Sequence, residues 1–152
     1  MSIHSINSSI LGIVLITLLF YTHVLSLKPY LNKPPDKARF AVVVRTDLNL
    51  TKGQYALLTA HTTVACYKKA LKEYPTGIKI WMNEGQSKVV LKASEKGNQI
   101  LPALIKKAES IKLVTCATRN IANTKAGQIA VAGFGPGSAS KIKKVTGQLK
   151  LF

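Results

Sequence analysis

The chain has 152 residues, of which 22 are Lys or Arg and 6 are Asp or Glu, so its formal net charge is +16. A hydrophobic share of 47% is too high for a disordered basic tail, and two cysteines exclude a disulfide scaffold. The length allows one ordinary domain, and the excess of positive charge favours a polyanionic partner, either nucleic acid or an anionic membrane surface.

The N-terminal part differs sharply from the rest. Residues 1–27 contain no Lys, Arg, Asp or Glu, and residues 10–27 are nearly all apolar. This run is at the short end of the length that crosses a bilayer as a helix. We predict an N-terminal hydrophobic helix that anchors the chain in a membrane. The alternatives are a cleaved signal segment and, least favoured, a buried core helix.

The charges that follow the apolar run predict its orientation. Basic residues follow the run and none precedes it, so the positive-inside rule places the rest of the chain in the cytosol. Residues 28–38 are rich in proline and are interpreted as a stiff linker, which leaves residues 39–152 as the folded domain. A cytoplasmic or a secreted protein is the alternative location.

The first elements of the domain are a strand and a long helix. Residues 40–44 form a continuous β-branched run, which is typical of a strand buried on both faces. Thr51 and Gln54 then form a capping-box pattern that predicts a helix over residues 52–72. Its core stripe is expected along one face of the helix, at Ala56, Ala60, Val64, Tyr67 and Leu71.

The remaining elements complete an alternating order. Residues 78–82 form a short amphipathic segment whose type the sequence leaves open. Three further strands are predicted at residues 88–92, 113–118 and 129–134, and two further helices at residues 95–110 and 138–145. The order indicates the α/β class, as a single compact domain with helices over a mixed sheet. The glycine-rich segment 133–137 fits a tight turn better than a phosphate-binding loop, because Pro136 has no N–H.

A few side chains are candidates for chemistry. Lys52 lies in the first helical turn, where the helix dipole disfavours a cation; it is either a group that contacts a phosphate or an oxyanion, or a solubilising lysine. His61 is either a general base, with Asp47 as its orienting carboxylate, or a partly buried histidine on the helix flank. Cys66 and Cys116 are expected to be inert core thiols. No Cys/His cluster has zinc spacing, so no metal or other cofactor is expected.

Several sequence blocks resemble one family. The first is Val43-Val44-Arg45-Thr46-Asp47-Leu48, followed by Lys52-Gly53, Ala56 and Ala60-His61. The second is Trp81 followed by Glu84-Gly85-Gln86-Ser87-Lys88-Val89-Val90-Leu91-Lys92. The third is Gly133-Phe134-Gly135-Pro136-Gly137 leading to Lys144-Val145-Thr146-Gly147-Gln148-Leu149-Lys150-Leu151-Phe152. From about Phe40 to Phe152 the chain resembles the archaeal/eukaryotic-type peptidyl-tRNA hydrolases (peptidyl-tRNA hydrolase 2), as a divergent member.

The resemblance implies a fold, a reaction and a set of residues. It implies a four-stranded mixed β-sheet with helices on both faces, and hydrolysis of the ester that joins a peptide to tRNA. Lys52, His61 and Asp47 fall on the family's functional positions, and a basic surface would hold the tRNA through its phosphates. The expected phosphate contacts are Lys68, Lys69, Lys72 and Arg119. The apolar N-terminus is similar to that of members associated with mitochondria, which suggests the mitochondrial outer membrane.

The chain also departs from the family pattern. The family carries an Asp-Ala-Gly-x-Thr motif after its third strand, and residues 118–122 read Thr-Arg-Asn-Ile-Ala instead. Thr118 is taken as the replacement of the motif's aspartate, and no carboxylate occurs between Lys112 and Phe152. The alternative function is therefore a catalytically impaired relative that binds tRNA or a protein partner at a membrane. A domain of this kind could form a homodimer, but the sequence does not give the oligomeric state.

Overall fold

The computed structural model describes residues 12–22, 37–94, 97–119 and 127–152. The chain divides into two compact units, Met1–Pro34 and Pro35–Phe152, which are described separately. In the first unit, residues 12–22 form a helix. No helix in the described parts of the chain is both long enough and apolar enough to cross a membrane. The expected anchor at residues 10–27 extends at both ends into residues outside the described ranges.

The second unit is built on one mixed sheet with the strand order β3-β4-β1-β2-β5. Its strands are β1 (Ala38–Arg45), β2 (Lys88–Ala93), β3 (Thr115–Arg119), β4 (Ile129–Ser138) and β5 (Lys150–Leu151). Strands β1 and β2 are parallel, and the other neighbours are antiparallel. The α/β class and the mixed sheet are confirmed, but the number of strands expected was wrong, because the sheet has five and not four. The fifth strand, β5, is two residues long, too short to produce a periodic pattern.

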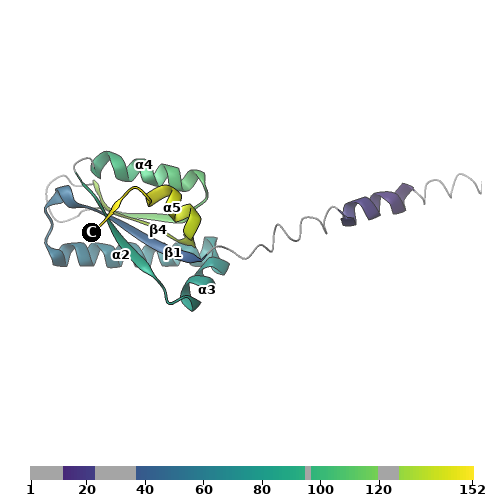
Figure 1. The fold of residues 1–152 in the computed structure, drawn as a ribbon, viewed down its shortest axis with the longest axis horizontal. Helices are drawn as coiled ribbons and strands as arrows, with labels where there is room; N and C mark the ends of the chain where they lie inside the picture. The colour runs from purple at the N-terminus through teal and green to yellow at the C-terminus, as the bar shows by residue number, and fades with distance from the viewer. Residues whose placement is uncertain (1–11, 23–36, 95–96, 120–126) are drawn as a thin grey trace, which may run out of the picture. The chain divides into compact units, whose positions relative to one another are not determined.

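Helices cover both faces of the sheet (Figure 1). Helices α2 (Lys52–Glu73) and α3 (Pro75–Asn83) pack on one face, and α4 (Gly97–Ser110) and α5 (Ala139–Thr146) pack on the other. A short 3₁₀ helix, η1 (Thr46–Leu48), follows β1. Helices on both faces were expected, and the segment 78–82, whose type the sequence left open, lies inside α3.

Strand β1 lies at the centre of the fold and is buried on both faces. Phe40, Val42 and Val44 pack with α2 and α3, whereas Ala41 and Val43 pack with α4 and α5. A strand with two apolar faces has no polar alternation, which is why its sequence reads as one continuous run. The expectation for residues 40–44 is therefore confirmed.

The start of α2 agrees with the sequence, but the buried face of the helix does not. Gln54 N donates to Thr51 Oγ1 and Thr51 N donates to Gln54 Oε1, so the capping box is present. The fully buried residues of α2 are Thr62, Cys66 and Ala70. Of the expected core stripe only Tyr67 packs against the core; the rest of the stripe was wrong, since Ala56, Ala60, Val64 and Leu71 are exposed.

A glycine in β4 explains the buried face of α2. A Cβ atom at Gly133 would lie 2.6 Å from Cys66 Sγ and 3.0 Å from Thr62 Cγ2. The bare backbone of β4 therefore accommodates small side chains of α2 at close range. Hydropathy alone favoured the larger aliphatic residues, which lie on the outer face. The segment 133–137 is itself part of β4 rather than a turn, and Gly137 pairs with Arg39 of β1.

Candidate active site

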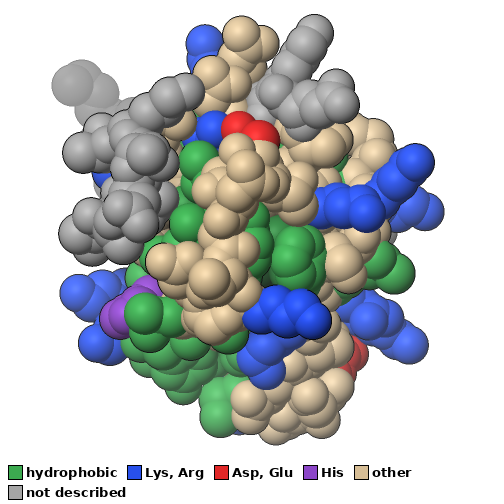
Figure 2. Space-filling view, turned by 90° about the vertical axis from the view of Figure 1, so that its left-hand side faces the viewer, with side chains coloured by type: hydrophobic (Ala, Val, Ile, Leu, Met, Phe, Trp, Pro, Cys, Tyr) green, Lys and Arg blue, Asp and Glu red, His purple; other side chains and the backbone are tan. Residues whose placement is uncertain are grey.

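Several of the candidate residues gather at one end of the sheet. The parallel strands β1 and β2 both end there, α2 begins there, and the antiparallel pairing places the end of β3 beside the start of β4. Ligands of open α/β sheets commonly bind outside the carboxyl ends of parallel strands. Figure 2 shows this end, with Lys and Arg side chains around a central area of apolar and uncharged groups and with few Asp or Glu. We call it the carboxyl end of the sheet.

An ion pair between a buried arginine and a partly exposed aspartate organises this end. Arg45, the last residue of β1, is 3% exposed, and its guanidinium donates to both carboxylate oxygens of Asp47, at 2.9 Å and 2.5 Å. The same group donates to Gln128 Oε1 at 2.9 Å. Tyr55 on α2 donates its hydroxyl to the carbonyl of Arg45 at 2.8 Å. These bonds tie β1, η1, β4 and the first turns of α2 together.

Lys52 is placed at the same end as Asp47. It is the first residue of α2 and is exposed, so its ammonium group is available to a ligand. Tyr55 lies three positions further along the helix, and residues at that spacing are neighbours on a helix surface. Because Tyr55 is bonded to Arg45, the start of α2 is held against the Arg45–Asp47 pair.

His61 lies apart from this group. It is exposed on α2, and a helical rise of 1.5 Å per residue puts it about 14 Å along the axis from Lys52. The carboxylate of Asp47 is engaged by Arg45, not oriented toward a histidine base. The structure thus brings Lys52 and Asp47 to one end of the sheet and leaves His61 further along the helix.

The expected tRNA contacts divide between the two ends of the sheet. Arg119 ends β3 at the carboxyl end and donates to the carbonyl of Gly127. Lys68, Lys69 and Lys72 lie near the other end of α2, about 24–30 Å along the axis from Lys52. Lys69 donates to the carbonyl of Thr115 at 3.1 Å and lies 3.9 Å from Glu73, whereas Lys68 and Lys72 are exposed.

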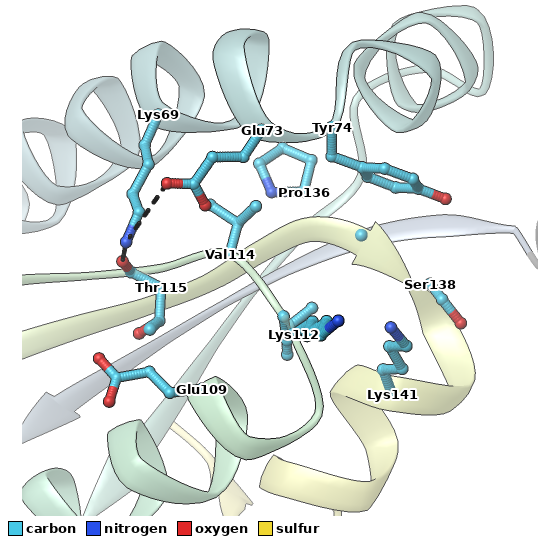
Figure 3. Close-up of a pocket in the computed structure, with 12 residues that line it drawn as sticks. Lys69, Glu73, Tyr74, Glu109, Lys112, Val114, Thr115, Pro136, Ser138 and Lys141 are labelled. Atoms are coloured by element: carbon cyan, nitrogen blue, oxygen red, sulfur yellow. Dashed lines mark hydrogen bonds and ion pairs between the residues drawn. The ribbon is translucent and has the colours of Figure 1, made fainter.

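A cavity of about 420 Å³ lies at the end of the sheet opposite Lys52 (Figure 3). Lys69 and Glu73 line it from α2, Lys112 and Thr115 from the segment before and at the start of β3, and Lys141 from α5. The hydroxyl of Thr115 is buried and has no hydrogen-bond partner among the described residues. The cavity is therefore separate from the group formed by Arg45, Asp47 and Lys52.

Thr118 points into the fold. Its Oγ1 lies 2.7 Å from Oγ1 of Thr62, which donates to the carbonyl of Leu58. The side chain is thus held between β3 and α2 rather than at the open end of the sheet. Residues 120–126, the remainder of the stretch compared with the family motif, lie outside the described ranges.

Two cysteines in the same interface shift each other's pKa in opposite directions. The thiol of Cys66 hydrogen-bonds to Cys116, and this bond together with burial raises the pKa of Cys66 above its ordinary range. The same bond lowers the pKa of Cys116 to about 7, with a smaller contribution from the charge of Lys69. Cys116 is only half-buried, so the expectation of two inert thiols fits Cys66 better than Cys116.

Sequence reasoning missed several residues at the carboxyl end of the sheet. Arg45 was not considered as a site residue, although an arginine at the end of a buried strand has to find a counterion. Tyr55 and Phe152 were missed because their contact joins the two ends of the domain sequence, with ring centroids 5.3 Å apart. In the described residues, no three His, Cys, Asp or Glu side chains are grouped closely enough to hold a metal ion.

Comparison with known proteins assigns the fold to a family. Residues 38–152 match the family model described as "Peptidyl-tRNA hydrolase PTH2". The chain is 40% identical over 118 residues to "Probable peptidyl-tRNA hydrolase 2" of Schizosaccharomyces pombe. It is 38% identical over 117 residues to "Peptidyl-tRNA hydrolase" of Thermococcus sibiricus and 37% identical over 116 residues to "Peptidyl-tRNA hydrolase 2, mitochondrial" of Homo sapiens.

These alignments cover most of this chain but different shares of its relatives. They include 76%, 76% and 75% of this chain, respectively. They span 57% of the fission-yeast protein, 98% of the archaeal protein and 64% of the human protein. The family model covers the whole sheet and the four helices packed on it. The chain therefore belongs to the peptidyl-tRNA hydrolase PTH2 family.

Proposed function

We propose that this protein hydrolyses the ester bond of peptidyl-tRNA and releases free tRNA and peptide. The relatives named above are peptidyl-tRNA hydrolases, and one of them, from Thermococcus sibiricus, is matched over nearly its full length. The observation that carries the proposal is the position of Lys52, an exposed cation at the carboxyl end of the parallel strands, the same end as the Arg45–Asp47 pair. A net charge of +16 suits a polyanionic substrate.

Lys52 has a specific role in this proposal. Water attacks the carbonyl carbon of the ester, and the Lys52 ammonium stabilises the negative charge that develops on the carbonyl oxygen. The attacking water loses a proton to solvent, the bond to the ribose oxygen breaks, and that oxygen takes up a proton from solvent as tRNA leaves. Asp47 acts indirectly, by holding Arg45 and through it Tyr55 at the start of α2. We place His61 outside the reacting centre, because it lies about 14 Å further along the helix.

The position of the motif aspartate is also part of the proposal. Thr118 is engaged with Thr62, so it is a poor counterpart for a residue that acts on water. The family spacing of Asp and Thr, four residues apart, is instead met in this sequence by Asn120 and Thr124. We propose that Asn120 takes the aspartate's place. An amide orients a water molecule but does not accept its proton, so turnover should be slower than with a carboxylate.

The proposal is tested by peptide release from peptidyl-tRNA with the full chain. Removing one oxyanion donor costs about 100-fold or more in rate, so Lys52→Ala should lose at least that much. Lys79→Ala, an exposed lysine on α3, is the matched control and should leave the rate unchanged. Asn120→Asp should raise kcat, whereas Thr118→Asp should not. A wild-type chain that releases no peptide, or a Lys52→Ala variant as fast as wild type, would overturn the proposed reaction.

We propose that exposed cations hold the tRNA through its phosphates. Lys68, Lys72 and Arg119 are exposed, whereas the ammonium group of Lys69 already donates a hydrogen bond to the carbonyl of Thr115. Each phosphate contact adds about 0.9 to the slope of log affinity against log salt concentration. Removing Lys68 and Lys72 together should lower that slope by nearly two. A slope that stays unchanged would show that this part of α2 does not contact tRNA.

We propose that residues 10–27 hold the chain on a membrane with the domain of residues 39–152 in the cytosol. The support is the apolar composition of the segment and the basic residues that follow it. The human and bovine relatives are named mitochondrial, which favours the mitochondrial outer membrane. Protease added to intact organelles should digest the domain. A domain that is digested only after the membrane is broken would contradict this orientation.

A further inference from the structure

A small surface patch beside Lys52 combines a half-buried tyrosine with an exposed phenylalanine and two exposed lysines. It consists of Tyr55 from α2, Lys92 from β2, and Lys150 and Phe152 from the C-terminal segment. Lys92 pairs with Lys150 across the two strands, and Phe152 N donates to the carbonyl of Val90 at 3.1 Å. Val90 packs on the α2 side of the sheet, and side chains two residues apart on a strand share a face. All four side chains therefore lie on the α2 face. We call them the C-terminal patch.

The aromatic part of the patch is rigid but open. The ring of Phe152 meets the ring of Tyr55 edge-on, with centroids 5.3 Å apart and an interplanar angle of 60°. The hydroxyl of Tyr55 is bonded to Arg45, the backbone of Phe152 is bonded to β2, and the contact with Tyr55 holds one side of the Phe152 ring. Nevertheless, Phe152 is 58% exposed. An aromatic side chain that is held in place and still open to solvent suits a planar ligand that stacks on it.

In the basic part of the patch, two lysine side chains repel each other when no anion is bound. Lys92 and Lys150 are direct cross-strand neighbours and both are exposed. Like charges directly opposite each other destabilise an antiparallel pair. Within the part of the chain that the structure describes, neither lysine lies within 4.0 Å of a carboxylate, since the ion pairs there are Arg45–Asp47 and Lys69–Glu73. An anion between the two ammonium groups would relieve this repulsion.

We infer that the C-terminal patch binds the 3′-terminal nucleotide of tRNA, with the adenine on Phe152 and its phosphate between Lys92 and Lys150. This inference rests on the proposed function. Tyr55 is three residues from Lys52, so their Cβ atoms lie about 5–6 Å apart. The ribose of the terminal adenosine carries both the ester and the base, so one sugar ring separates the two. A base on Phe152 therefore leaves the ester within reach of Lys52.

The base contact is tested by a double-mutant cycle with deacylated tRNA and the full chain. One partner is varied by removing the terminal adenosine from the tRNA, and the other by Phe152→Leu, which keeps an apolar side chain but removes the aromatic face. Wild type should lose about tenfold in affinity when the adenosine is removed, the size of one stacking contact. Phe152→Leu should show no such difference, and Phe152→Tyr should keep it. The same loss in Phe152→Leu as in wild type would overturn the inference.

The phosphate contact has its own test, with stability as a second readout. Lys150→Ala and Lys92→Ala should each lower the salt dependence of tRNA binding by about one phosphate contact. Neither should lower the melting temperature, because each removes a repulsion. Lys106→Ala, an exposed lysine on α4, is the control and should change neither property. Lysine variants that bind tRNA as wild type does would exclude the phosphate contact.

The two proposals fail in different ways. A wild-type chain that releases peptide but binds tRNA equally well with and without the terminal adenosine would reject the patch and leave the hydrolase intact. A chain that needs the terminal adenosine and Phe152 for binding, yet releases no peptide, would reject the hydrolase and leave the patch as a binding site for the tRNA end.

Discussion

The hydroxyl oxygens of Thr62 and Thr118 lie 2.7 Å apart across the interface between α2 and β3. Thr62 is fully buried, and its hydroxyl donates a hydrogen bond to the carbonyl of Leu58, so the two hydroxyls form a short chain of hydrogen bonds. Thr118, which the sequence matched to the family's aspartate, thus takes part in the packing of a helix on an edge strand. A carboxylate introduced there would enter this interface rather than the open end of the sheet.

Thr118→Asp is therefore expected to destabilise the domain. A carboxylate next to buried Thr62 loses hydration without gaining a counterion, and the free energy of unfolding should fall by about 2–3 kcal/mol. Ala117→Asp is the matched control, because Ala117 is exposed on the other face of the same strand, and its effect should stay below about 0.5 kcal/mol. Urea unfolding followed by circular dichroism measures both. Equal losses in the two variants would contradict the interface role of Thr118.

Gly133→Ala is expected to force α2 away from the sheet. The added Cβ would lie 2.6 Å from Cys66 Sγ and 3.2 Å from Phe40 Cζ, and such overpacking costs about 1–3 kcal/mol. Gly53→Ala is the control, since a Cβ there meets nothing within 4 Å and alanine favours the helix by about 0.5–1 kcal/mol. Thermal unfolding should move in opposite directions for the two variants. A Gly133→Ala protein as stable as wild type would show that the helix has room to shift.

Asp47→Asn is expected to lower the free energy of unfolding by more than the partial exposure of Asp47 suggests. It leaves the buried Arg45 guanidinium without its counterion, which costs about 3 kcal/mol or more. Glu73→Gln removes the other described ion pair, in which both side chains are largely exposed and 3.9 Å apart, and should cost under about 1 kcal/mol. The two free energies of unfolding are compared at one pH and salt concentration. Equal values would mean that Arg45 finds another partner.

Cys116 is expected to react with iodoacetamide at lower pH than an ordinary thiol. The hydrogen bond from Cys66 lowers its pKa to about 7, so the thiolate population rises as the pH increases through 7 instead of 9. Cys66 should stay unmodified, because its pKa is raised and it is buried. In Cys66→Ala the donor is lost, and the reactivity of Cys116 should move toward higher pH. Mass spectrometry of the labelled protein measures modification at both sites. An unchanged pH profile of Cys116 in Cys66→Ala would show that Cys66 does not lower its pKa.

Elements with a local cause could be predicted from the sequence. The β1 run is continuous because the strand is buried on both faces, and the capping box of α2 lies within four residues. What could not be predicted depends on distant partners. The buried face of α2 is decided by Gly133 in β4, and β5 exists because two C-terminal residues pair with β2.

The candidate site shows the same division. Lys52 stood out because a cation at a helix start is locally unfavourable, and that signal needs no tertiary information. The pairing of Asp47 with Arg45, rather than with a histidine, depends on a side chain at the end of a buried strand. The contact between Tyr55 and Phe152 joins the start and the end of the domain, so no local sequence pattern predicts it.

The central position of β1 has a consequence for how the domain folds. One of its edges pairs with β2, but the other pairs with β4, where Ala38 meets Ser138 near the end of the chain. Contacts between such distant segments carry a large loop-closure cost and slow the search for the native state. During synthesis, β1 keeps one backbone edge unpaired until β4 has left the ribosome, and unpaired strand edges promote aggregation. We expect this domain to fold late and all at once.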